Sequence, residues 1–242
     1  MTMETQKKNV SEFKSDVKAN SGYRYTTNAP YSSEVANRRI TEATLAEIPG
    51  DAASLIDVGC GDGTYTQALK SARPSLDCTG FDPATDAVDI AGKKYPGCRF
   101  IAGDLLNPST HPDRKFDIAI VRGVLHHLPD ATAGIANAMR LSDRIVFIEP
   151  NGNNPILKWL ERNSEYHISH EEQSFTSRQL VEWCAVGGYA VRKLDFIGFV
   201  PFFFPAPLAR IIHFFQPFLE KLYPVKKYFG AQIVIVCTKN GP

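Results

Sequence analysis

Residues 55–65 constrain the fold more than any other part of the chain. They read Leu-Ile-Asp-Val-Gly-Cys-Gly-Asp-Gly-Thr-Tyr, so an apolar run leads into glycines at three alternating positions. Residues 64–70 suit a helix, and we expect a strand, a tight turn and a helix in that order. Glycines at such a turn let a ligand approach the backbone, and the helix start presents unpaired N–H groups. The segment therefore predicts a nucleotide-type cofactor across the end of a strand.

Composition and charge narrow the functional class. A chain of 242 residues fits one α/β domain, which we place at 31–242 behind a flexible segment at 1–30. The 27 Lys and Arg nearly balance the 26 Asp and Glu and form no basic block, so we expect no nucleic acid partner. Five scattered cysteines and the absence of an apolar run near the N-terminus predict a cytoplasmic protein with neither a disulfide framework nor a zinc site.

Short apolar runs alternate with amphipathic stretches after the glycine segment. This alternation predicts a doubly wound α/β sandwich, in which mostly parallel strands are covered by helices on both faces. Ser32 or Ser33 can cap the first helix. We expect strands at 54–58, 76–81, 98–102, 116–121, 144–148, 189–196 and 232–238, and helices at 31–48, 64–70, 86–94, 131–141 and 175–184.

Polar or small residues follow each predicted strand, where ligands bind in sheets of this kind. Gly59 and Gly61 follow the first strand, and Asp82 ends the second, about 20 residues further on. An acidic side chain there can accept both hydroxyls of a ribose. NAD enzymes use the same device, but the Gly-x-Gly-x-Gly spacing here differs from their Gly-x-Gly-x-x-Gly. A dinucleotide is therefore the weaker interpretation.

Four motifs in this order resemble the class I S-adenosylmethionine-dependent methyltransferases. They are Val-Gly-Cys-Gly-Asp-Gly at 58–63, Gly-Phe-Asp-Pro at 80–83, Gly-Asp-Leu at 103–105, and the segment from Phe-Asp-Ile at 116–118 to Leu-His-His-Leu-Pro-Asp at 125–130. The resemblance covers about residues 50–150. It implies an enzyme that uses S-adenosyl-L-methionine, built on a Rossmann-like sheet of about seven strands with an antiparallel last strand.

The resemblance also implies roles for the residues at the first two strand ends. Gly59 and Gly61 would let the methionine part of the cofactor lie on the backbone. Asp57 would support the turn or meet the amino group, and Asp82 would hold the ribose hydroxyls. The local alternative is that the glycines only form a turn and that Asp82 only starts the next one.

Roles for the third and fourth strand ends follow from the same resemblance. Asp104 would accept from the adenine amino group opposite the Leu105 N–H, or else cap a local turn. Arg122 would flank the sulfonium end of the cofactor. The family often has an uncharged residue at that position, so we expect the Arg122 side chain to turn away or to reach the substrate.

Two pairs of histidines are candidates for catalysis and substrate binding. Methyl transfer from a sulfonium depends mostly on positioning, and a base is needed only when the acceptor is a neutral hydroxyl or a protonated amine. His126 and His127, after the fourth strand, are candidate bases, or structural histidines. His167 and His170 are candidate substrate contacts in a loop that otherwise faces water. Carboxylates adjoin the second pair of histidines in the sequence, but no third ligand from a distant part of the chain joins them. We therefore expect no metal.

Residues 199–230, between the last two strands, are rich in aromatic side chains. A membrane-spanning helix is excluded by Pro201, Pro205, Pro207 and Pro217, with Arg210 in the middle. Apolar spacing instead predicts an amphipathic helix kinked near Pro217. We consider a cap or lid over the substrate site, a membrane-surface element that uses Lys226 and Lys227, and a homodimer interface. Extra core beside the sheet is the structural alternative.

These observations together predict a methyltransferase with a small, lipophilic or aromatic acceptor. We expect methylation at oxygen more than at nitrogen or carbon. The enzyme would be cytoplasmic, with possible contact to the membrane periphery. The alternatives are a nucleotide-cofactor oxidoreductase and a non-catalytic module that binds the cofactor.

Overall fold

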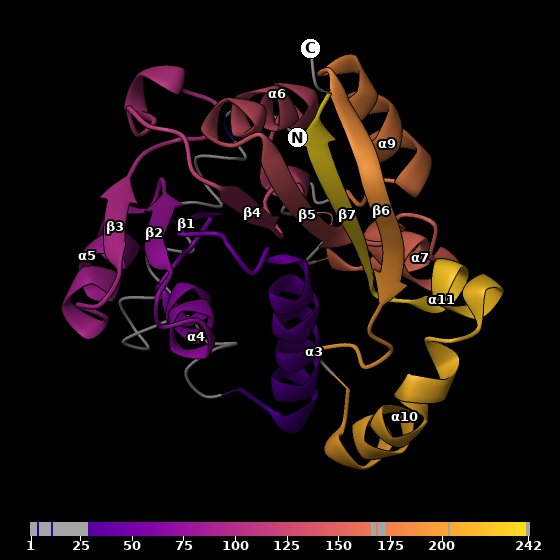
Figure 1. The fold of residues 1–242 in the computed structure, drawn as a ribbon. Coiled ribbons are helices and arrows are strands. Elements are labelled where there is room, and N and C mark those ends of the chain that lie inside the picture. The colour runs from indigo at the N-terminus through magenta and orange to yellow at the C-terminus, as the bar shows by residue number, and fades with distance from the viewer. Residues whose placement is uncertain are drawn as a thin grey trace.

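Seven strands form one sheet in the order β3-β2-β1-β4-β5-β7-β6 (Figure 1). The computed structural model describes residues 29–165, 168, 173–202 and 204–240, together with Glu4 and Ser11. The first five strands pair in parallel, whereas β7 runs antiparallel to β5 and β6. The strands are β1 (Ser54–Val58), β2 (Asp77–Asp82), β3 (Arg99–Ala102), β4 (Ile118–Arg122), β5 (Arg144–Pro150), β6 (Tyr189–Ile197) and β7 (Gln232–Lys239). The doubly wound sheet with an antiparallel last strand is confirmed.

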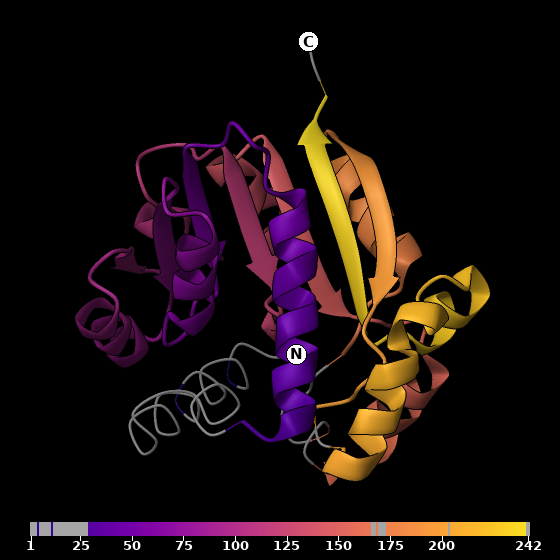
Figure 2. The ribbon, with the colours of Figure 1, turned by 60° about the horizontal axis from the view of Figure 1, so that its bottom comes forward.

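Helices cover both faces of this sheet (Figures 1 and 2). Each predicted helix and strand forms, and its ends differ from the prediction by no more than two residues. The α-helices described are α3 (Tyr31–Glu47), α4 (Thr64–Ala72), α5 (Thr85–Lys94), α6 (Ala131–Leu141), α7 (Pro155–Asn163), α9 (Ser177–Val186), α10 (Ala206–Leu219) and α11 (Tyr223–Phe229), and the short 3-10 helices are η1 (Pro108–Thr110) and η2 (Leu125–His127).

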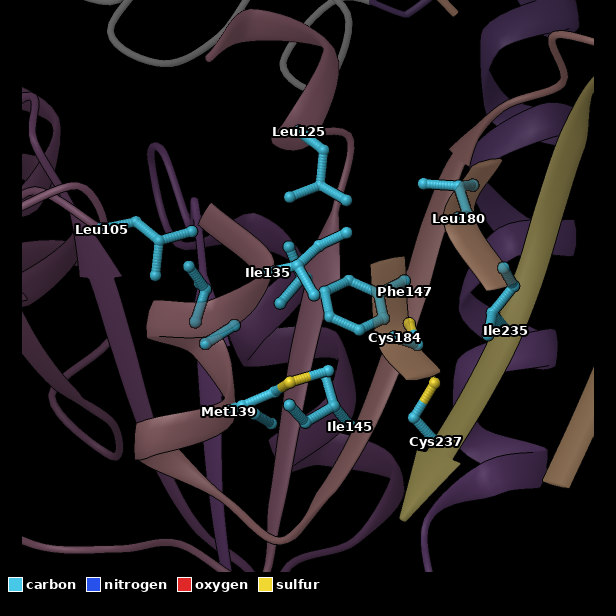
Figure 3. Packing of buried hydrophobic residues seen from close by; sticks show 14 of the residues in the cluster. Leu105, Leu125, Ile135, Met139, Ile145, Phe147, Leu180, Cys184, Ile235 and Cys237 are labelled. Carbon is cyan, nitrogen blue, oxygen red and sulfur yellow. The ribbon is translucent and has the colours of Figure 1, made fainter. Parts of the chain in front are cut away.

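The core lies in two layers because successive strand side chains point to opposite faces. Ile56 of β1 packs in a cluster with residues of α6 and α9, whereas its neighbour Leu55 packs in a cluster with residues of α3 and α4. Figure 3 shows the first cluster, in which Ile135 of α6 lies against Phe147 of β5 and Leu180 of α9 belongs to the same group. Apolar side chains on both faces hold the parallel strands, and their carboxyl ends share one edge.

The start of α3 differs from the prediction. Neither Ser32 nor Ser33 caps the helix, whose N-cap residue is Pro30. Both serine side chains are buried and donate hydrogen bonds to the carbonyl of Phe202, at 2.7 Å and 2.9 Å. The serines lie two and three residues after the N-cap position, and they instead attach α3 to the segment that precedes α10.

The insertion between β6 and β7 packs against α3 (Figure 2). Val35 of α3 and Ala209 of α10 belong to one small buried cluster. Arg39 of α3 donates to both carboxylate oxygens of Glu220, the C-cap residue of α10, at 2.7–3.0 Å. The predicted amphipathic helix is thus present, and Pro217 lies in its last turn.

The insertion lies at the carboxyl edge of the parallel strands. Gln232, the first residue of β7, pairs with Pro150 at the end of β5 and with Ile197 at the end of β6. The chain therefore leaves β6, forms α10 and α11, and returns to the sheet at the edge where the glycine turn also lies. Within the residues described, no helix is both long and apolar enough to cross a membrane.

Candidate cofactor site and catalytic residues

The three alternating glycines all adopt left-handed backbone conformations. Their φ angles are 78° at Gly59, 52° at Gly61 and 76° at Gly63, a region that side chains with a Cβ rarely occupy. The turn is also tightly packed, because a Cβ on Gly59 would lie 2.3 Å from Cγ2 of Val124. The sequence pattern therefore marks a turn that needs glycine for both conformation and space.

Asp82 connects the end of β2 to this turn. Its side chain is buried, and its carboxylate accepts hydrogen bonds from the backbone N–H of Gly61 at 2.9 Å and of Ala84 at 2.8 Å. The structure thus brings together two residues for which the sequence implied cofactor contacts. Its bond to the Ala84 N–H means that Asp82 also starts the next turn, as the local alternative predicted. One carboxylate has enough lone pairs to form this turn and to bind a ribose.

Asp57 supports the helix that follows the turn. It is buried at the end of β1, and its Oδ2 accepts a hydrogen bond from the Thr66 hydroxyl of α4 at 2.6 Å. Burial raises the pKa of Asp57 above its ordinary value, while the Thr66 bond and the charge of Arg122 act in the opposite direction. Of the two roles implied for Asp57, this geometry matches support of the turn.

Arg122 reaches from the end of β4 towards α3. Its guanidinium lies 3.5 Å from the ring centroid of Tyr65, and its two terminal nitrogens donate to Thr41 at 3.3 Å and Asn37 at 3.2 Å. Burial lowers the pKa of Arg122, opposed by Tyr65 and Asp57. The side chain therefore turns away from the strand end, which was one of the two expected arrangements. Sequence reasoning assigned no role to Tyr65, although it lies two residues after the last glycine of the motif.

Asp104 and Leu105 lie at the end of the adjacent strand, β3. Asp82 pairs in register with Ala102, so Asp104 follows two residues beyond that pair. Asp104 Oδ1 accepts a hydrogen bond from the Leu106 N–H at 2.9 Å. Leu105 is buried in the same core cluster as Leu125 (Figure 3). The polar ends of β1, β2 and β3 therefore lie side by side.

A carboxylate holds His126 after the fourth strand. Glu149 is fully buried near the end of β5, and its Oε2 accepts a hydrogen bond from His126 Nδ1 at 2.8 Å. The rings of His126 and His127 are in contact, with centroids 3.9 Å apart and planes tilted by 42°. Sequence reasoning placed Glu149 at a strand end but missed this pair. The only hint of this pair in the sequence was Glu149 itself, a single acidic residue directly after an apolar run.

The other histidine candidates cannot be placed. His167 and His170 lie outside the described residues, as does nearly all of the expected flexible segment at 1–30. Among the residues that are described, no three His, Cys, Asp or Glu side chains gather as a group of possible metal ligands.

Sequence comparisons connect the central part of the chain to methyltransferases. Residues 55–143 match a family model described as a methyltransferase domain. A trans-aconitate 2-methyltransferase of Methylobacterium nodulans is 34% identical over 86 residues, which cover 34% of this chain and 33% of the relative. A demethylmenaquinone methyltransferase of Thermotoga maritima is 28% identical over 115 residues, 46% of this chain and 48% of the relative. The chain thus spans about a third to a half of these relatives' length.

Solved structures share the fold over nearly the whole chain. Magnesium protoporphyrin IX methyltransferase from Synechocystis PCC 6803, with bound S-adenosylmethionine, has a TM-score of 0.65 at 15% identity and covers 99% of both chains. A Haloferax volcanii protein in complex with the Trm112 methyltransferase activator has a TM-score of 0.66 at 15% identity, covering 95% of this chain and 98% of that one. Residues 55–143 thus match a methyltransferase domain, and the chain as a whole has the fold of solved S-adenosylmethionine-dependent methyltransferases.

Proposed function

We propose that this protein transfers the methyl group of S-adenosyl-L-methionine to a small, lipophilic or aromatic acceptor, at oxygen rather than at nitrogen or carbon. One observation carries the proposal. The turn of Gly59 and Gly61, the carboxylate of Asp82 and that of Asp104 lie at the carboxyl ends of three neighbouring parallel strands. Ligands of doubly wound sheets bind at this edge.

The residues present fit the cofactor. The left-handed glycines leave bare backbone for its methionine part. Asp82 would accept from the ribose hydroxyls with the lone pairs that its bonds to Gly61 and Ala84 leave. Asp104 would accept from the adenine amino group, and the Leu105 N–H would donate to the ring. When bound, the cofactor supplies a methyl group already activated by the sulfonium.

Methylation at oxygen is supported by the bond between His126 and Glu149. A carboxylate at Nδ1 keeps the proton on that nitrogen and leaves Nε2 to accept one, the arrangement of an oriented imidazole base. A neutral hydroxyl acceptor needs such a base, whereas an unprotonated amine can react without one. We assign the base role to His126 and the positioning role to Glu149.

A lipophilic acceptor is supported by the insertion. α10 and α11 emerge at the strand edge that carries the candidate site, and they expose several aromatic side chains. An apolar cap at this edge would exclude water from an apolar substrate. The cap or lid role of residues 199–230 is part of this proposal.

Calorimetric titration tests the cofactor half of the proposal. Asp82 also holds the Gly61 N–H, so an Asp82 variant can lose affinity through the turn alone. We therefore compare S-adenosylhomocysteine with its 2′-deoxy analogue on the wild type and on Asp82→Asn. If Asp82 holds the ribose, removal of the hydroxyl weakens binding to the wild type but has much less effect on the variant. Equal losses would contradict this role, and failure of the wild type to bind would refute the cofactor proposal.

A second experiment tests the acceptor. The protein is incubated with cell extract and cofactor carrying a labelled methyl group, and the products are separated between organic and aqueous phases. We expect label in the organic phase, in a product whose mass rises by one methylene, with loss of label in His126→Asn. Label confined to the aqueous phase would contradict a lipophilic acceptor. Binding of NADH in place of the sulfonium cofactor would instead favour an oxidoreductase.

A further inference from the structure

The surface of α10 that faces away from α3 is apolar. Leu208, Ile211, Phe215 and Phe218 recur at steps of three and four residues, so they form one stripe along the helix. Phe214 beside them is 78% exposed. The residues that are buried in α10, Ala209 and Gln216, lie on its other side. α10 therefore differs from an ordinary amphipathic helix, because its apolar stripe faces solvent and not the core.

The stripe is part of a larger surface, which we call the apolar face. α11 follows α10 directly and exposes aromatic side chains, and α7, which packs against α11, exposes Trp159 at 62%. Figures 1 and 2 show α10 and α11 projecting at the same end of the molecule. The apolar face consists of Ile156, Trp159, Leu208, Ile211, Phe214, Phe215, Phe218, Tyr223, Tyr228 and Phe229, each at least 44% exposed.

The charged residues around the apolar face are mostly basic. Glu220 is the only acidic residue between 204 and 229, and its carboxylate is held by Arg39. The same segment carries Arg210, Lys221 and Lys227, and the first two are exposed. A positive rim around an apolar, aromatic surface is complementary to anionic lipid headgroups above acyl chains.

We propose that the apolar face docks on the surface of an anionic phospholipid bilayer, with α10 lying in the plane of the interface. Protein interfaces share the aromatic side chains but are depleted of lysine, so Lys221 and Lys227 favour a lipid over a second copy of the chain. Docking in the interface needs only an apolar stripe, not a spanning helix. The candidate site opens at the same edge of the sheet, so a docked enzyme meets acceptors held in the membrane.

Vesicle flotation with the full chain tests this inference without any activity measurement. Phosphatidylcholine vesicles with and without phosphatidylglycerol are compared at low and high salt. We expect the wild type to float with the anionic vesicles and to be released by salt. Phe214→Asp combined with Phe218→Asp should weaken partitioning at least about tenfold, and Lys221→Glu at least about fivefold.

Matched controls lie on other elements. Val186→Asp changes an apolar residue that is 89% exposed at the end of α9, and Lys93→Glu changes an exposed lysine of α5. Both controls should float like the wild type. Each variant is also titrated with S-adenosylhomocysteine, so that loss of flotation in a folded, cofactor-binding protein reports on the apolar face alone.

Three outcomes would overturn the inference. The wild type could stay off the anionic vesicles while it still binds S-adenosylhomocysteine, which would leave the proposed methyl transfer untouched. The two phenylalanine substitutions could have no more effect than Val186→Asp. Light scattering could show a wild-type dimer that these substitutions convert to a monomer, with no flotation in either form, which would make the apolar face a homodimer interface.

Discussion

Glu149 holds both the side chain and the backbone of the segment after β4. One carboxylate oxygen accepts from His126 Nδ1 at 2.8 Å, and the other accepts from the N–H groups of Val124 and Leu125, each at 2.9 Å. Because Glu149 is fully buried, these bonds are shielded from competing water. A single buried acid thus fixes the imidazole ring relative to the strand end.

Glu149→Gln should lower kcat by about a hundredfold or more if His126 is the base. The amide keeps the size of the side chain, but its NH2 group cannot accept from Nδ1, so the proton moves to Nε2 and blocks proton uptake. The measurement is kcat against pH. The wild-type rate should rise through the pH range where imidazole titrates, and the variant should lose this step.

Comparison of two histidine variants shows whether His126 or His127 is the base. His126→Asn should reproduce the kcat loss of Glu149→Gln, with S-adenosylhomocysteine still bound. His127→Asn, which changes the ring in contact with His126, should retain the pH-dependent step. If His127→Asn abolishes that step while His126→Asn retains it, the base is His127 and Glu149 is a structural residue.

Gly59→Ala should destabilise the protein and weaken cofactor binding. The positive φ at Gly59 costs a residue with a Cβ about 1–2 kcal/mol, and the added methyl would clash with Val124. Gly92→Ala is the matched control, because Gly92 lies in helix α5 and a Cβ there meets nothing within 4 Å. That change should raise stability by about 0.5–1 kcal/mol. Urea unfolding of both variants checks the opposite signs, and equal signs would contradict the account.

The fold could be predicted because its signals are local. β1 begins and ends at the predicted residues, since an apolar run between a Pro-Gly break at 49–50 and the glycine turn leaves little choice of ends. The capping role expected of Ser32 and Ser33 was wrong for a nonlocal reason. Their hydroxyl partner is the carbonyl of Phe202, about 170 residues later in the chain.

The candidate site was predictable only in part, because some of its contacts join residues that are far apart in the sequence. Residues that follow a strand could be assigned to the carboxyl edge from the chain order alone, as for Asp82 and Asp104. The direction of a long side chain depends on what packs beside it. Arg122 stacks on Tyr65 and bonds to α3, and His126 bonds to Glu149 of another strand, contacts that no spacing within one motif encodes.

Arg122→Met should lower the free energy of unfolding by roughly 2 kcal/mol, because it removes the contact with the Tyr65 ring and the hydrogen bonds to Asn37 and Thr41. It also removes the positive charge that acts on the buried Asp57. Burial already raises the pKa of Asp57, and without Arg122 the pKa should rise further. The folded state then keeps a proton that the unfolded state releases, so stability falls as pH rises above about 4 towards the folded pKa.

Urea unfolding between acid and neutral pH measures this effect. The stability difference between the wild type and Arg122→Met should widen as pH rises. Arg178→Met is the matched control, because Arg178 pairs with Glu182 on the exposed surface of α9, where such pairs contribute little. A difference for Arg122→Met that stays constant with pH would show that Arg122 stabilises only by packing and hydrogen bonding.

Asp117→Asn should lower stability at neutral pH and leave it unchanged in acid. Oδ2 of Asp117 accepts from the backbone N–H groups of Ala53 and Ser54 and from the Ser54 hydroxyl, which joins the start of β4 to the start of β1 and lowers the pKa of Asp117. A lowered folded pKa gives stability that is present above about pH 4 and lost as pH falls through the folded value. The site is exposed, so we expect a difference below about 1 kcal/mol at pH 7.

Thermal unfolding from neutral pH to below pH 3 measures this difference, with Asp89→Asn on the exposed side of α5 as the control. A difference that grows towards acid would contradict the assigned bonds.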